Sequence, residues 1–171
     1  WLLREPPDLA DAVGEVAITD HYLTGTRLRL RMAVDRRGAV PTTYKLGQKV
    51  PGPGGGPRLT TNIYLTHAEY ELLRTLGGDR LTKVRHSFPP FGVDVFDPPL
   101  DGLVLAEAEL PSQDEAAAIA GPDLAVAEVT DDDRFTGGRL ACTSRPELAA
   151  CLAEVLGRWS PGSGTPPPQN G

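Results

Sequence analysis

The chain has 171 residues, of which 40% are hydrophobic and 23% are charged, a balance typical of a folded globular domain. Its net charge of −6 argues against a general nucleic-acid binder, because such proteins are usually basic. No apolar stretch approaches the roughly 18–20 residues of a membrane span and no signal peptide is recognised, so we expect no membrane or nucleic-acid partner.

Along most of the chain, polar and apolar residues alternate with the period of two that is typical of β-strands. The connections between these segments are short, which favours antiparallel neighbours because parallel strands need long crossovers. The predicted strands span residues 15–23, 26–34, 41–49, 58–66, 80–87, 92–97, 103–110 and 124–130.

Three helix starts carry a capping box, in which a Ser or Thr and a Glu three residues later satisfy the first N–H groups of a helix. They are Thr66–Glu69, Ser112–Glu115 and Ser144–Glu147. After the last box, apolar residues recur at helical spacing from Leu148 to Trp159, so we expect this helix to dock on the rest of the fold.

The domain organisation is simple. We expect one folded domain over residues 1–159 and a disordered tail over 160–171, because the tail is rich in Gly, Pro and Ser. Residues 50–57 are also glycine-rich, but they lack the Gly-Lys-Ser/Thr ending of a phosphate-binding loop and predict a plain connection.

The cysteines and histidines do not predict a metal site. Cys142 and Cys151 match no zinc spacing, and two free thiols suit a reducing cytoplasm, where we expect the protein to reside. The three histidines, which form no metal-binding pair, are His21, His67 and His86.

Charged residues of one sign share one face of several predicted strands, whereas random surface patterning would mix the signs. One explanation is an ordinary sheet with a solvated face; the other is a closed sheet whose charges line a common interior, with helices covering the apolar exterior. We favour the second. The cations are Arg27, Arg29, Arg31, Lys45, Lys49, Lys83 and Arg85, and the carboxylates are Asp94, Glu107, Glu109 and Glu128.

An interior lined by both signs needs a ligand that satisfies both. Guanidinium groups match the geometry of phosphate oxygens, and carboxylates hold a hard divalent cation that in turn binds phosphate. The pattern therefore predicts a polyanionic phosphate chain bound with its metal, and phosphoryl transfer is chemistry that needs mainly positioning and charge stabilisation.

The segments "WLLRE", "YLTGTRLRLR", "YKLGQK", "LTKVR", "VDVFDPPLDGLVLAEAEL" and "EVTDDDRFTGGRLA", in this order, resemble the CYTH superfamily of triphosphate tunnel metalloenzymes, and in particular its small bacterial members. The resemblance implies an α+β, mainly β fold: a closed eight-stranded antiparallel tunnel barrel with helices packed outside.

The resemblance also implies roles for the charged residues. Six cations would bind the phosphates, with Arg27 as an added cation on the same face: Arg29, Arg31, Lys45, Lys49, Lys83 and Arg85. Four carboxylates would lie at the metal site, which takes Mg²⁺ or Mn²⁺: Glu107, Glu109, Asp94 and Glu128. We expect the acidic run 131–133 to cap a turn rather than bind metal.

Two departures from the family pattern concern catalysis. The family's Glu-x-Glu-x-Lys strand, whose lysine is assigned to activating the attacking water, would lie immediately before Trp1 and is missing from this chain, so we name no catalytic residue. At positions where active relatives often carry inward glutamates, this chain has Thr60 and Asn62, which bind metal more weakly.

Together these observations predict a metal-dependent triphosphatase that hydrolyses inorganic tripolyphosphate or another triphosphate, as a monomer or homodimer. Two alternatives stay open. An adenylate cyclase of the same fold would convert ATP to a cyclic product, and a non-catalytic polyphosphate-binding module would bind its ligand without turnover.

Overall fold

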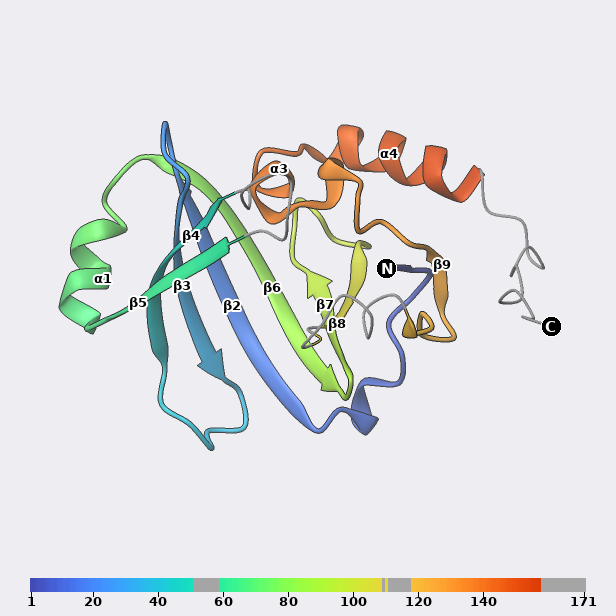
Figure 1. The fold of residues 1–171 in the computed structure, drawn as a ribbon, viewed down its shortest axis with the longest axis horizontal. Coiled ribbons are helices and arrows are strands. Elements are labelled where there is room, and N and C mark those ends of the chain that lie inside the picture. The colour runs from blue at the N-terminus through green and yellow to red at the C-terminus, as the bar shows by residue number, and fades with distance from the viewer. Residues whose placement is uncertain (51–58, 109, 111–117, 158–171) are drawn as a thin grey trace.

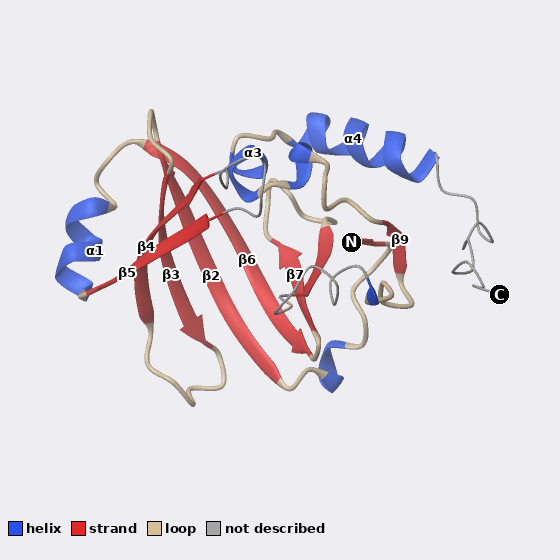
Figure 2. Ribbon diagram, viewed as in Figure 1, coloured by secondary structure: helices blue, strands red, loops and turns tan. Residues whose placement is uncertain are grey.

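A computed structural model describes residues 1–50, 59–108, 110 and 118–157 of the chain. Antiparallel strands make up most of it (Figures 1 and 2). The described strands are β1 (Leu2–Leu3), β2 (Gly14–Leu23), β3 (Leu28–Asp35), β4 (Thr43–Val50), β5 (Leu59–Leu65), β6 (Gly78–Phe88), β7 (Phe91–Phe96), β8 (Val104–Ala108) and β9 (Ala125–Ala127).

The strands form a single sheet in the order β5-β4-β3-β2-β6-β7-β8-β1-β9, and every pair is antiparallel. The α+β, mainly β class is confirmed, but the prediction of a closed eight-stranded barrel is wrong. The described sheet has nine strands, and its two ends, β5 and β9, do not pair with each other. Among the described residues, β9 pairs only with β1, and β5 pairs only with β4. β1 and β9 contain two and three residues, so this end of the sheet offers little backbone for a further pairing.

The register of the strands assigns side chains to two faces, because directly opposite residues in antiparallel strands point the same way. Arg31 lies opposite both Asp20 and Lys45, and Arg85 lies opposite Asp94. We call the face that carries these side chains the charged face. The opposite face carries Leu28, Leu30, Leu46 and Ile63, as the alternation predicts.

One helix covers the opposite face. Helix α1 (His67–Leu73) begins at Thr66, whose side chain and Glu69 form the predicted capping box. Its buried Tyr70 packs on Tyr44 of β4, with ring centroids 4.8 Å apart. Tyr44 lies on the side away from the charged face, so α1 packs outside the sheet as expected.

The other helices pack over one end of the charged face, and here the prediction of helices on the exterior is wrong. Helices α3 (Gly137–Ala141) and α4 (Arg145–Gly157) bury Leu140 and Leu148 in one core with Leu81, Phe96 and others. Leu81 and Phe96 share the charged face with Lys83. That face therefore has an apolar end, and burying this end requires a helical cover.

The predicted start of α4 is confirmed, since the Glu147 carboxylate accepts hydrogen bonds from the Ser144 N–H and hydroxyl. The predicted box at 112–115 and the tail at 160–171 lie outside the described residues. Two short 3₁₀ helices, η1 (Leu9–Asp11) and η3 (Asp133–Phe135), complete the described elements. Asp132 caps η3 by accepting from the Arg134 N–H, so the acidic run does cap a turn.

Among the strands that the structure describes, β5 forms one edge of the sheet. Its sequence, LTTNIYL, contains no charged residue, and every residue before Leu65 is exposed. Ile63 and Tyr64 are 57% and 70% exposed. None of the described helices is long and apolar enough to cross a membrane.

Candidate functional site

The charged face extends across the sheet from the edge strand β5 to β8. It brings together six of the seven cations that the sequence predicted: Arg29, Arg31, Lys45, Lys49, Lys83 and Arg85. The seventh, Arg27, lies instead in an exposed turn, because β3 begins one residue later. The Thr26 hydroxyl accepts from the Leu28 N–H and holds this turn, in which Gly25 has φ +72°.

Asp20 of β2, which the sequence did not single out, anchors the cations of β3. Its carboxylate is 1% exposed and accepts two hydrogen bonds from Arg31, from Nε at 2.6 Å and from Nη2 at 2.7 Å. The Nε of Arg29 lies 3.5 Å from the same carboxylate. Burial alone lowers the pKa of Arg31, but the hydrogen bonds and charge of Asp20 outweigh burial and raise that pKa overall.

Tyr22 lies two residues beyond Asp20 and opposite Arg29. Burial, followed by the negative charge of Asp20, raises the pKa of its phenol to about 12, although a hydrogen bond with Arg29 opposes this shift. The phenol also packs against α3: a Cβ added to Gly137 would lie 2.1 Å from the Tyr22 hydroxyl oxygen. Tyr22 thus connects the helical end of the charged face to Arg29.

A second buried carboxylate anchors the cations of β6. Asp94 is 0% exposed, accepts from Arg85 Nε and Nη2 at 2.7 Å each, and also accepts from the Lys83 ammonium. Burial raises the pKa of Asp94, but the hydrogen bonds and charges of Arg85 and Lys83 outweigh burial and lower that pKa overall. In this structure Asp94 acts as the counter-ion of two cations.

Two glycines leave room for side chains of the charged face. A Cβ on Gly47 of β4 would lie 2.8 Å from Asn62 Oδ1 and 3.7 Å from Arg29 Nη2. A Cβ on Gly92 of β7 would lie 3.2 Å from Arg85 Cδ. A side chain at Gly92 would therefore crowd Arg85, whereas a side chain at Gly47 would collide with Asn62 and make only ordinary contact with Arg29.

Toward the β5 edge the charged face is less tightly paired. Lys45 Nζ lies over the Tyr64 ring, 4.9 Å from its centroid. Lys49 is exposed and lies opposite Thr60. Asn62 lies opposite Gly47. The two neutral residues that depart from the family pattern are therefore on the charged face, as predicted from their positions.

The four carboxylates predicted as metal ligands do not gather. Asp94 is fully engaged by Arg85 and Lys83, and Glu109 lies outside the described residues. Glu107 pairs with Arg85 but is half exposed. Glu128 is exposed on the far side of β1. Among the residues that the structure describes, no three His, Cys, Asp or Glu side chains lie where they would hold a metal ion together, so these residues alone do not form a complete metal site.

Glu107 and Glu128 nevertheless flank the start of the chain. β1 lies between β8 and β9, and the Trp1 ammonium donates to the Ala106 carbonyl at 2.8 Å. Burial lowers the pKa of this ammonium, and the charges of Glu107 and Glu128 oppose that shift. Both carboxylates are therefore close enough to act on one charge between them.

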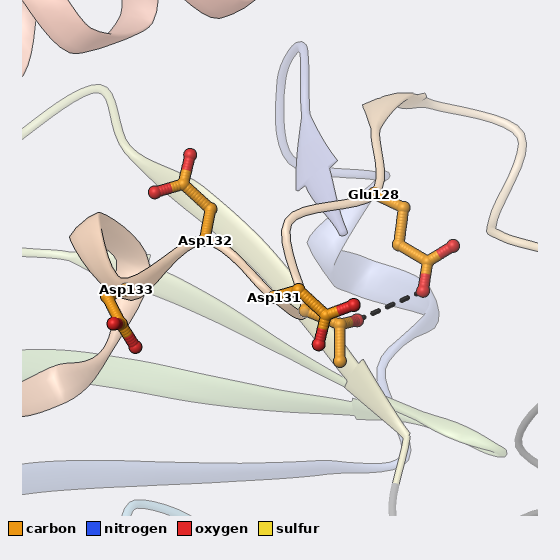
Figure 3. A pocket seen from close by; sticks show the side chains of 5 residues that line it. Glu128, Asp131, Asp132 and Asp133 are labelled. Atoms are coloured by element: carbon orange, nitrogen blue, oxygen red, sulfur yellow. Dashed lines mark hydrogen bonds between the residues drawn. The ribbon is translucent and has the colours of Figure 1, made fainter.

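An acidic hollow of about 600 Å³ follows Glu128, lined by that residue, Thr130 and Asp131 to Asp133 (Figure 3). The Thr130 hydroxyl donates to Glu128 at 3.1 Å. In the figure, the side chains of Asp132 and Asp133 point away from Glu128, and Asp132 holds Arg134. These carboxylates do not converge on one point.

The charged face can hold an anion. By the strand register it carries six cations and five carboxylates, which are Asp20, Asp35, Asp79, Asp94 and Glu107. Asp35 and Asp79 lie near strand ends, where Asp35 accepts from the backbone of its turn and Asp79 accepts from the Cys142 thiol. Arg31 and Arg85 bind their carboxylates through Nε and Nη2, so with respect to the described residues the Nη1 groups remain as donors for a ligand with several oxygens.

A curved antiparallel sheet with paired cations over buried carboxylates agrees with the sequence motifs, and the chain has the fold of the CYTH, or triphosphate tunnel metalloenzyme, superfamily. Among solved structures it is similar to two crystal structures of the protein NE1496, one of which bears the name inorganic triphosphatase. Each has 25% sequence identity and a TM-score of 0.55; the match covers 84% of this chain and 95% and 91% of the two NE1496 chains. No protein-family model and no curated protein matches the chain.

Proposed function

We propose that the charged face binds a triphosphate and that the protein hydrolyses its terminal phosphoanhydride bond, with inorganic tripolyphosphate as the first candidate substrate. The observation that carries the proposal is the set of six cations on one face of the sheet, two of which, Arg31 and Arg85, are held by buried carboxylates. The name of the structural neighbour NE1496, an inorganic triphosphatase, supports it at the level of the fold.

The residues of the charged face would do most of the chemistry. Phosphoryl transfer requires the phosphates to be held in line and their developing charge to be neutralised. Arg31 and Arg85 are fixed by buried carboxylates, so their remaining donors are already oriented before the substrate arrives, which is the condition for effective charge stabilisation. Lys45 and Lys49 would contact the part of the chain nearer the β5 edge.

We propose that Mg²⁺ or Mn²⁺ enters as a complex with the triphosphate rather than as a resident of a site built by the protein alone. Mg²⁺ commonly binds through one or two carboxylates together with substrate phosphates. Glu107 and Glu128 would supply them, since the charges of both act on the Trp1 ammonium; Glu109 stays a prediction. When bound, the ion would neutralise phosphate charge and polarise the phosphate oxygens.

A non-catalytic triphosphate-binding module is the second candidate. It is favoured by the neutral residues Thr60 and Asn62 on the charged face and by the lack of a complete metal site among the described residues. Such a module would bind the anion through the same cations and leave it intact.

The experiment combines calorimetric binding of tripolyphosphate with phosphate release in Mg²⁺ or Mn²⁺, using the wild-type chain and a Glu107→Gln, Glu128→Gln double variant. A triphosphatase releases phosphate, and the double variant loses turnover by about 10²–10³-fold while it still binds. Glu71→Gln, which removes an exposed carboxylate of α1, is the matched control and should behave as wild type. Binding without turnover in the wild-type chain would favour the module, and absence of binding would contradict both functions.

A further inference from the structure

The charged face contains two ion clusters built on the same plan. In the first, which we call the Asp20 cluster, Asp20 holds Arg31 and lies near Arg29. In the second, the Asp94 cluster, Asp94 holds Arg85 and Lys83. Each cluster is built on one carboxylate that is 1% exposed or less and holds two cations. The Asp20 cluster therefore keeps one positive charge to offer to a ligand, whereas in the Asp94 cluster the half-exposed Glu107 also pairs with Arg85.

The two clusters lie on either side of β2. Arg31 of β3 is opposite Asp20 of β2, whereas Arg85 of β6 is opposite Val16 of β2. The backbones of β3 and β6 are thus about 9–10 Å apart across the sheet, two strand spacings, and the two arginines are also offset by four residues along β2. The long side chains can bring the two guanidinium groups nearer to each other than their backbones are, and the charge of Arg85 acts to lower the pKa of Arg31.

Two guanidinium groups that repel each other define a place between them for an anion. A single phosphate has its oxygens around one centre, whereas a linear chain of phosphates distributes them over a greater length. A ligand that reaches both clusters must therefore be a chain, provided that Arg31 and Arg85 are held at a fixed separation. Asp94 fixes Arg85, and Asp20 is the group that fixes Arg31.

We propose that Asp20 is a positioning residue that holds Arg31 at a set distance from Arg85, so that the charged face selects a linear polyphosphate over a single phosphate. The proposal rests on the triphosphate-binding function above. Asp20 would thereby help to select the length of the bound phosphate chain, in addition to stabilising the fold.

A positioning role and a purely electrostatic role for Asp20 predict opposite changes in anion affinity when the carboxylate is removed. If Asp20 merely offset positive charge, Asp20→Asn would strengthen the binding of every anion, since the face would become more positive. If Asp20 positions Arg31, the same variant weakens tripolyphosphate binding, because an amide cannot accept both N–H groups of the guanidinium. Asp20→Glu is the sharper variant, since it keeps the charge and moves the carboxylate by one methylene.

The experiment measures calorimetric affinities of orthophosphate, pyrophosphate and tripolyphosphate for wild type, Asp20→Asn and Asp20→Glu, with thermal unfolding as a check on folding. Glu15→Gln is the control, because Glu15 lies on the same strand and pairs with Arg36 at an exposed site. We expect wild type and control to favour tripolyphosphate over orthophosphate, and both Asp20 variants to lose about tenfold or more of that preference.

The outcomes separate the two hypotheses. An unchanged preference in Asp20→Glu would overturn the positioning role and leave the proposed function intact. If Asp20→Asn does not fold, Asp20→Glu and an Arg31→Lys variant, which keeps the charge but removes the two-point bond, still decide the question, and both should lose the preference. A wild-type chain that binds no tripolyphosphate would overturn the proposed function and the positioning role with it.

Discussion

Replacement of Asp94 by Asn tests whether this residue acts as a counter-ion. Asn keeps the shape of the side chain but removes the charge that Arg85 and Lys83 share. Lys83 is 6% exposed and would remain a buried cation without its partner. Breaking a buried ion pair from one side typically costs about 3–5 kcal/mol in the free energy of unfolding, which corresponds to a fall in melting temperature of roughly 6–20 °C for a chain of this size.

The assay is urea unfolding followed by circular dichroism, with EDTA present throughout. A residue whose main role was to bind a metal would give no stability difference under these conditions, whereas a counter-ion gives the full difference. Lys83→Met is the matched variant: it removes one cation but leaves Asp94 its two-point bond to Arg85, so we expect a smaller loss than for Asp94→Asn.

The pH dependence provides a second check. The pKa of Asp94 is lowered in the folded protein, so its contribution to stability is complete above the unfolded value of about 3.9 and is lost as the pH falls through the lowered value. The difference between wild type and Asp94→Asn should therefore persist to about pH 4 and shrink only below it. A loss under about 1 kcal/mol at neutral pH, the range of exposed ion pairs, would refute the counter-ion role.

The remaining predictions concern packing and protonation. Gly137→Ala should destabilise the protein by about 1–3 kcal/mol, measured by urea unfolding, because its Cβ would lie 2.1 Å from the Tyr22 hydroxyl oxygen; wild-type stability would contradict the close contact. Gly92→Ala should weaken tripolyphosphate binding by calorimetry, up to about tenfold, since its Cβ would lie 3.2 Å from the anchored Arg85 side chain; an unchanged affinity would show that the side chain can shift. Burial and then the charge of Arg80 lower the pKa of His21, so unfolding free energy should fall as the pH drops below the unfolded value of about 6.5, and this part of the fall should be absent from His21→Gln in a pH series of melting curves.

Much of the fold follows from the period-two pattern. The predicted strand 15–23 is observed as Gly14–Leu23, and 41–49 as Thr43–Val50. β1 was missed because two residues are too few to show any period. The open sheet was also missed, because alternation indicates which face a side chain occupies but not whether the last strand meets the first.

The candidate site was predictable in its cations and less so in its carboxylates. Arg29 and Arg31 can be predicted from the sequence because they occupy alternate positions of one strand. Asp20 is the only charged residue on its face of the strand, between Ile18 and Tyr22, and its partner is eleven residues away. Aligning β2 with β3 across the turn at Gly25 places Asp20 opposite Arg31, so pairing the hairpin, rather than examining each strand separately, would have found it.

The uncharged edge strand β5 has a consequence for handling the protein in solution. Natural sheets usually guard their edges with lysines, prolines or bulges, and an unguarded edge can accept a strand from a neighbouring molecule. β5 is separated from Asp20 in β2 by β4 and β3, so such an association would leave the Asp20 cluster intact. Concentrated samples should therefore lose solubility before they lose affinity, and a lysine at Ile63 would be the first substitution to try for structural work at high concentration.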